Sequence, residues 1–175
     1  IGSIPWALAS RSHCPLAVIN ARAATDEEEA AAAQDRAATV VVGVDSAEHC
    51  GPVLDCAFRE ASIRGGTLRA VHVWDYIEVD YSADPLRELS WTNGMHGESI
   101  ELTRILAGYR EDYPDVPVEQ RIVDARPYAG LIEAAGQADL LVVGSRGRGS
   151  VASLTMGSTS HRLLHTAPCP LLITM

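Results

Sequence analysis

The segment DLLVVGSRGRGS, residues 139–150, decides the fold because an apolar run leads directly into a glycine-rich turn. Its first half, residues 139–144, carries four consecutive aliphatic side chains, which is typical of a strand buried on both faces of a parallel sheet. The glycines that follow allow positive φ and let backbone N–H groups approach an anion, since no Cβ stands in the way. The segment therefore predicts an α/β protein with an anion-binding loop after a buried strand.

The rest of the chain after residue 38 continues this alternation of short apolar runs and helical segments. Further strands are expected at 39–44, 67–74, 118–123 and 169–174, and helices at 49–64, 95–113 and 126–137. Strands that alternate with helices require right-handed crossovers, which place helices on both faces of a parallel sheet. The sequence therefore predicts a doubly wound α/β domain over residues 39–175.

Composition and charge exclude several classes of function. The 175 residues include 23 acids and 14 bases, for a net charge of −9, whereas a nucleic-acid surface needs clustered cations. No lysine occurs, which excludes a Walker A loop and lysine-based covalent catalysis. The four cysteines lack zinc spacing and are expected to be reduced thiols in a cytoplasmic protein. No apolar run approaches the roughly 20 residues that span a bilayer, and no catalytic or metal-binding residue is predicted.

The N-terminal segment GSIPWALASRSHCPLAVI, residues 2–19, repeats the C-terminal segment at residues 157–174. Aligned without gaps, the two are identical at six of 18 positions, against roughly one expected from average usage. We interpret residues 1–19 as the last helix and strand of a preceding repeat domain, and the acidic, Ala-rich residues 20–38 as a linker. Because apolar edge strands need a partner, this hypothesis predicts that residues 16–19 pair antiparallel with residues 171–174.

The glycine-rich loop can be compared with known phosphate-binding patterns. The dinucleotide fingerprint is nearly met after Gly147, but it requires an acid about 20 residues further on, and no Asp or Glu follows Asp139. A second pattern is Gly144-x-x-Gly147, nine residues, then Gly157-Ser158. In that pattern Ser158 would offer an N-cap hydroxyl and a positive helix end to a phosphate. A glycine-rich turn without any ligand remains the alternative.

This spacing, together with the strand segment VVVGVDSAEHC at 40–50 and APCPLLIT at 167–174, resembles the ATP-binding subgroup of the universal stress protein family. The resemblance covers residues 39–174. It implies an open five-stranded parallel sheet of the adenine nucleotide alpha hydrolase-like type, with strand order 3-2-1-4-5. In such a sheet, ligands bind outside the carboxyl ends of the first and fourth strands.

The resemblance also implies which residues bind the nucleotide. Asp45 would contact the adenosine moiety, Val73 would contact adenine through its backbone, and the glycine loop would hold the ribose and the phosphates. Arg146 and Arg148 would either pair with phosphate or only solvate the loop. The expected binding residues are Asp45, Val73, Gly144, Arg146, Gly147, Arg148, Gly149, Gly157, Ser158 and Thr159.

Three functions remain open. The favoured one is a regulatory stress-response protein that binds ATP, with or without Mg²⁺, and has no nucleic-acid or membrane partner. It would act as a homodimer or with an intramolecular tandem partner, in either case through the last strand, Leu171 to Thr174. The second is a slow ATP hydrolase, for which the sequence offers no clear base. The third is a dimerisation scaffold that binds no nucleotide.

Overall fold

The computed structural model describes residues 3–19, 37–45, 50–74, 87–147 and 156–175. Its strands are β1 (Leu16–Val18), β2 (Thr39–Gly43), β3 (Thr67–Trp74), β4 (Val118–Asp124), β5 (Leu140–Gly144) and β6 (Leu171–Thr174). Its helices are α1 (Ser3–Arg11), α3 (Gly51–Ile63), α4 (Arg87–Asp112), α5 (Pro127–Ala134) and α6 (Ser158–Thr166). The predicted linker at 20–38 lies outside the described residues except for its last two positions.

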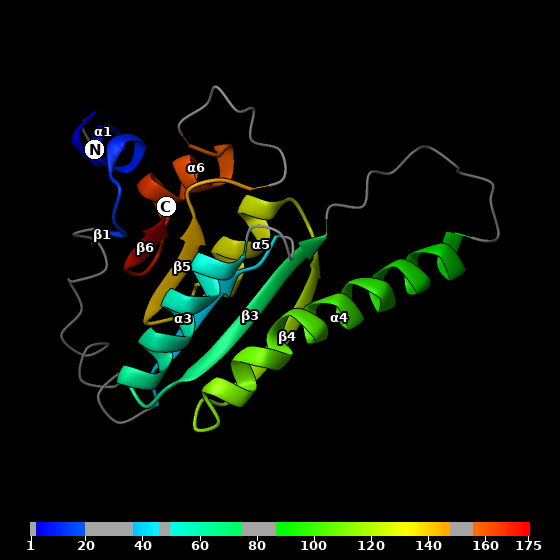
Figure 1. Ribbon diagram of the computed structural model, residues 1–175. Helices are drawn as coiled ribbons and strands as arrows, with labels where there is room; N and C mark the ends of the chain where they lie inside the picture. Colours follow the sequence, from blue (N-terminus) through cyan, green and yellow to red (C-terminus); the bar gives the residue numbers. More distant parts are fainter. Residues whose placement is uncertain (1–2, 20–36, 46–49, 75–86, 148–155) are drawn as a thin grey trace.

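The strands form one sheet in the order β1-β6-β5-β2-β3-β4 (Figure 1). Strands β2 to β6 are all parallel, and their order β4-β3-β2-β5-β6 is the predicted 3-2-1-4-5 arrangement. Strands β3 and β4 are added on one side of β2, and β5 and β6 are added on its other side. The order in which strands are added to the sheet therefore reverses at β2. The prediction of the α/β fold and of the parallel strand order is confirmed.

A sixth strand, β1, extends this sheet beyond the five predicted for the domain. It pairs antiparallel with β6, with Leu16 opposite Ile173 and Val18 opposite Leu171. The predicted pairing between the two repeated segments is therefore confirmed within one chain. The sheet is mostly parallel rather than wholly parallel, since the N-terminal segment uses the edge that β6 would otherwise expose.

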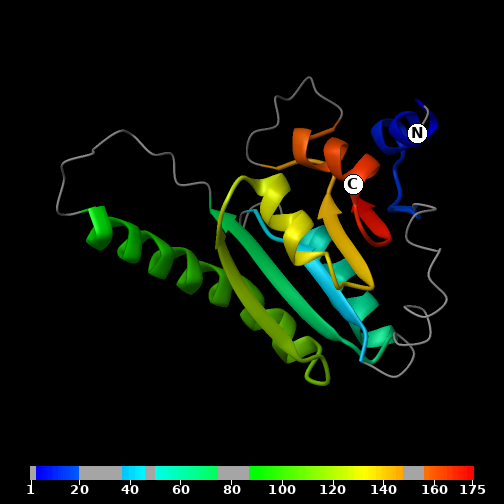
Figure 2. The same cartoon turned by 180° about the vertical axis from the view of Figure 1, so that it is seen from behind.

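Helices cover both faces of the sheet, and successive residues of β2 show this. Val40 and Val42 pack in a core with α3 and α4, whereas Val41 packs in a second core with α5 and α6. All three valines are fully buried, which explains why this strand shows no alternation of polar and apolar residues. Figure 1 shows α3 and α4 in front of the sheet, and Figure 2 shows α5 and α6 on the opposite face.

The ends of α3 follow the sequence closely. The helix begins after Cys50 with Pro52 in its first turn, where proline loses no intrahelical hydrogen bond. It ends at Ile63, just before Gly65, whose φ of +55° only glycine adopts without strain. The predicted end at the Gly65-Gly66 pair is confirmed.

Helix α4 is longer than predicted, since it begins at Arg87 rather than near residue 95. Its 26 residues correspond to about 39 Å at 1.5 Å per residue, so its first turns project beyond the sheet (Figure 1). The apolar spacing that predicts a helix exists where Leu102 and Leu106 are buried against β3 and β4. The projecting turns lack that spacing, and the sequence prediction missed them. None of the helices in the described ranges is both long and apolar enough to cross a membrane.

Candidate functional site

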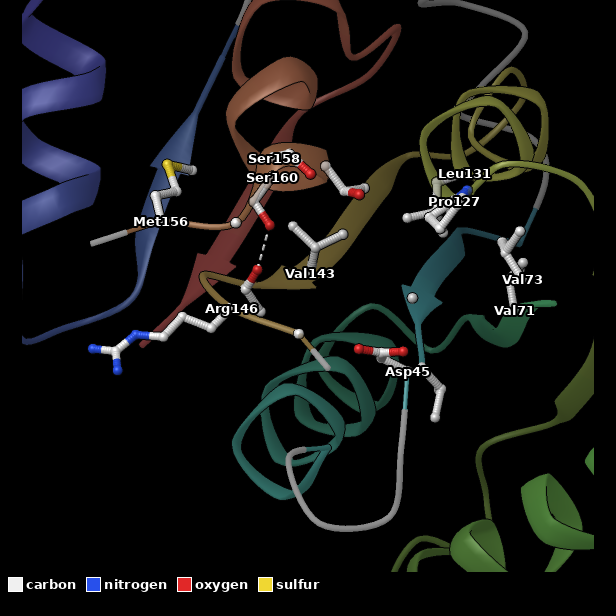
Figure 3. A pocket seen from close by; sticks show the side chains of 16 residues that line it. Asp45, Val71, Val73, Pro127, Leu131, Val143, Arg146, Met156, Ser158 and Ser160 are labelled. Carbon is white, nitrogen blue, oxygen red and sulfur yellow. Dashed lines mark hydrogen bonds between the residues drawn. The ribbon is translucent and has the colours of Figure 1, made fainter. Parts of the chain in front are cut away.

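A pocket of about 410 Å³ lies at the carboxyl ends of β2, β3 and β5, beside the first turns of α5 and α6 (Figure 3). Strands β2 and β5 are neighbours, and the crossover from β2 to β3 runs toward one edge of the sheet while the crossover from β5 to β6 runs toward the other. In open α/β sheets such a switch point leaves a crevice outside the strand ends, where ligands bind. The fold therefore places the pocket where the sequence analysis expected a site.

One wall of the pocket is apolar. Val71 and Val73 come from β3, Val143 comes from β5, and Pro127 and Leu131 come from α5 (Figure 3). Val71 and Val73 lie on the same face of β3 because side chains alternate along a strand. These five side chains form a surface that suits a flat apolar ring rather than a charged group.

The opposite wall is formed by the loop after β5 and the first turn of α6. Ser158, Thr159 and Ser160 all line the pocket. The first N–H groups of a helix lack intrahelical acceptors and carry the positive end of the helix dipole. The start of α6 is therefore a suitable place for an anion such as a phosphate.

Three short hydrogen bonds hold this loop in place. The Ser145 N–H donates to the Thr174 carbonyl at 2.7 Å, and the Gly157 N–H donates to the Ser145 carbonyl at 2.7 Å. The Ser160 hydroxyl donates to the Gly144 carbonyl at 2.6 Å. The two ends of the loop are thus tied to each other, and Ser145 also ties it to β6, whatever the conformation of the residues between them.

Asp45 and Gly147 bring the two predicted halves of the site into contact. A Cβ placed on Gly147 would stand 2.5 Å from Oδ2 of Asp45, so no larger residue fits there without moving the carboxylate. Figure 3 shows Asp45 at the end of β2, on the other side of the pocket from Ser158. The carboxylate is thereby placed at the mouth of the pocket, between the apolar wall and the loop.

Arg146 also lines the pocket, but its side chain is exposed and extends away from Asp45 (Figure 3). This arrangement fits a solvating role as well as a role in which the guanidinium turns toward a phosphate. The choice between the two stays a prediction.

The structure brings together most of the residues that the sequence singled out. Eight of them line the one pocket: Asp45, Val73, Gly144, Arg146, Gly147, Gly157, Ser158 and Thr159. Arg148 and Gly149 lie outside the described residues. That these ten residues bind a nucleotide stays a prediction.

Sequence reasoning missed several of the lining residues. Val71 was detectable, because it lies two positions before Val73 and therefore on the same face of the strand. Ser160 also had a signal, since a hydroxyl three and four residues before Leu163 and Leu164 falls on the buried face of α6. Pro127 and Leu131 had none, because no motif connects α5 to the glycine loop.

Comparison with known proteins identifies relatives over nearly the whole chain. The sequence profile of the universal stress protein family matches residues 23–174. A universal stress protein of Mycobacterium tuberculosis strain H37Rv is 36% identical over 173 residues, which are 99% of this chain and 55% of the relative. The chain thus spans about half the length of the curated relatives that it matches.

Solved structures of this family have the same fold. The universal stress protein UspA from Lactobacillus plantarum matches with a TM-score of 0.67 at 20% identity, over 80% of this chain and 99% of that one. A universal stress protein in complex with cAMP matches with a TM-score of 0.55 at 26% identity, over 79% of this chain and 97% of that one.

Proposed function

Because the chain belongs to the universal stress protein family, we propose that its pocket binds an adenine nucleotide and that the protein acts as a nucleotide-responsive regulator of the stress response. The observation that carries the proposal is the division of the pocket into an apolar wall and a helix N-terminus. A nucleotide has the same division, since a flat base is joined through ribose to a phosphate. The relative in complex with cAMP is a family member that holds such a ligand.

The residues of the pocket fit this ligand part by part. The base would lie against Val71, Val73 and Leu131, and the phosphate would lie at the first turn of α6. Asp45 lies between them, where a carboxylate accepts hydrogen bonds from ribose hydroxyls. The volume of about 410 Å³ falls within the range of about 300–1,000 Å³ that is usual for small-molecule sites.

We further propose that ATP is the preferred nucleotide. The proposal rests on the match of the loop to Gly144-x-x-Gly147, nine residues, Gly157-Ser158. Such a ligand regulates the protein only if it binds one conformational or assembly state more tightly than another.

Equilibrium dialysis tests both the binding of adenine nucleotides and the preference for ATP. The protein is dialysed against ATP, AMP and cAMP at up to millimolar concentration, each with and without Mg²⁺. We expect binding of adenine nucleotides, tightest for ATP, and loss of binding in Gly147→Val. A matched control is Gly108→Ala in α4, where an added Cβ meets nothing within 4 Å in the part of the chain that the structure describes. Absence of binding of all three nucleotides to the unaltered protein would contradict the function.

We also propose that α1 and β1 form part of a tandem arrangement with a preceding repeat domain. Leu8 is 52% exposed, whereas Leu163, its counterpart in the repeat, is fully buried. Leu163 of α6 packs on the sheet in the second core. If the sheet of a preceding domain lay against α1 in the same way, it would bury Leu8. The pairing of β1 with β6 would then join the two sheets. A homodimer that pairs through β6 would require β1 to separate from β6 first.

A further inference from the structure

His72 is a buried side chain close to the pocket but on the other face of the sheet. It lies on β3 between Val71 and Val73, and it is 5% exposed. Its Nδ1 atom lies 2.8 Å from the carbonyl oxygen of Val44, the residue between the end of β2 and Asp45. A carbonyl oxygen only accepts hydrogen bonds, so Nδ1 carries the hydrogen and donates it.

The other side of the imidazole faces α4. Nε2 lies 3.1 Å from Oε2 of Glu98, but the contact is not aligned as a hydrogen bond, and Nε2 has no hydrogen-bond partner among the described residues. On the neighbouring strand β4, Ile122 stands opposite His72 in register and brings no polar group. The imidazole is therefore oriented by its hydrogen bond to the Val44 carbonyl, while the Glu98 carboxylate lies beside its other edge.

The hydrogen bond from His72 to the Val44 carbonyl changes how the β2–β3 ladder ends. The Val44 N–H donates to the Val71 carbonyl at 2.9 Å, and in a regular parallel ladder the Val44 carbonyl would next accept the N–H of Val73. Within the described part of the chain no bond joins the Val73 N–H to that carbonyl, which His72 occupies instead. The Val73 N–H therefore points past the end of β2, on the side where Val73 lines the pocket.

We propose that His72 is a positioning residue for recognition of the base. By taking the Val44 carbonyl it ends the ladder one bond early and leaves the Val73 N–H to donate to a ring nitrogen of adenine. This inference rests on the proposed function. N1 of adenine accepts a hydrogen bond, whereas N1 of hypoxanthine carries a hydrogen, so a backbone donor at this place distinguishes the two bases.

Hydrogen exchange without nucleotide tests the structural half of the inference. The amide of Val73 is followed by NMR in the unaltered protein and in His72→Leu. We expect fast exchange in the unaltered protein and slower exchange in His72→Leu, because the freed Val44 carbonyl then accepts the Val73 N–H. Slow exchange in the unaltered protein, or no change in the variant, overturns the inference. If His72→Leu does not fold, the unaltered protein alone decides, since slow exchange of its Val73 amide overturns the inference.

Titration with AMP and with IMP tests the functional half. We expect AMP to bind at least tenfold more tightly than IMP, and His72→Leu to lose about tenfold in AMP affinity with little change for IMP, on the scale of one hydrogen bond. His72→Asn, whose amide nitrogen can stand where Nδ1 stands, is expected to restore the preference for AMP. Glu101→Gln is the matched control, since that exposed acid on α4 pairs with Arg104.

The outcomes separate this inference from the proposed function. Equal losses for AMP and IMP in His72→Leu, or no loss for AMP, overturn the role of His72 while nucleotide binding stands. If the unaltered protein binds neither nucleotide, the proposed function fails and base recognition by way of His72 fails with it. The exchange of the Val73 amide still shows in that case whether His72 ends the ladder.

Discussion

Gly147 lies directly against the carboxylate of Asp45, and a Cβ on Gly147 would stand 2.5 Å from its Oδ2 atom. The two residues follow different strands, Asp45 after β2 and Gly147 after β5. The two sides of the pocket therefore meet at this contact. A glycine at this position leaves room for the carboxylate, which a Cβ would displace.

Gly147→Ala is expected to weaken binding of AMP by about tenfold, or about 1.4 kcal/mol. The added methyl group would push the Asp45 carboxylate out of its place at the mouth of the pocket. Stability should change little, because Asp45 is exposed and its side chain can move. Isothermal titration calorimetry and urea unfolding measure the two effects.

The double variant Asp45→Ala/Gly147→Ala serves as the control for this mechanism. If the glycine acts through the carboxylate, the double variant binds AMP as Asp45→Ala does, since residues in contact are not additive. A full additional loss in the double variant would show that Gly147 acts independently of Asp45.

Two glycines of α4 provide a matched pair for stability. A Cβ on Gly94 would stand 2.5 Å from Cη2 of Trp74, whereas a Cβ on Gly97 would meet no described residue within 4 Å. Gly97→Ala should stabilise the protein by about 0.5–1 kcal/mol, because alanine is the better helix former. Gly94→Ala should destabilise it by about 1–3 kcal/mol through overpacking against the indole. Urea unfolding of the two variants decides this, and equal effects would contradict the contact between α4 and β3.

The protein should lose stability as the pH rises from about 9 to about 12. Burial raises the pKa of the Cys169 thiol to about 11, and burial together with the nearby Asp55 carboxylate raises the pKa of Tyr109 to about 12. The unfolded chain releases these protons near the ordinary pKa values of a thiol and a phenol, about 9 and about 10. The stabilisation is therefore complete below the unfolded pKa values and is lost as the pH rises through the folded ones.

Urea unfolding at pH 8 and at pH 10.5 measures this loss. Cys169→Ala should be less stable than the unaltered protein at pH 8, because the buried thiol is removed, but its stability should fall less between the two pH values. Parallel losses in the two proteins would show that Cys169 does not contribute to the pH dependence.

The central strands were predictable from the sequence because burial on both faces requires a continuous run of aliphatic residues. Val40, Val41 and Val42 are all fully buried, and such a run has few alternatives in an α/β chain. The edge pairing of β1 with β6 was predictable for another reason, the repeat itself, which gave two copies of one apolar strand. The strand β2 was thus predictable from neighbouring residues, and the β1–β6 pairing was predictable from the repeated segment.

The parts that could not be predicted depend on contacts between distant segments. Leu131 lines the pocket because α5 packs over the end of β3, and no local pattern encodes that packing. The contact of Gly147 with Asp45 and the bond from His72 to the Val44 carbonyl are of the same kind. A motif can indicate which residues bind a ligand, but it cannot show which of them are held in place by a third residue.

The edge of β6 gives the last prediction, since β1 covers a strand that would otherwise be free. Leu171 and Ile173 are fully buried, and Ala9 of α1 belongs to the same core. Deletion of residues 1–19 would leave β6 as an apolar edge strand, which is a template for pairing with another chain. The deleted residues lie outside the family match, which begins at residue 23.

We expect the shortened chain to form a dimer in which β6 of one copy pairs antiparallel with β6 of the other, because an isologous pair satisfies both edges at once. Sedimentation velocity from about 1 to 100 μM would then show a larger particle for the shortened chain than for the full chain. A synthetic peptide of residues 1–19 should return it to a one-to-one complex, and a scrambled peptide should not. If the shortened chain stays monomeric over this range, β6 is not a pairing edge, and assembly through the last strand is contradicted for the homodimer.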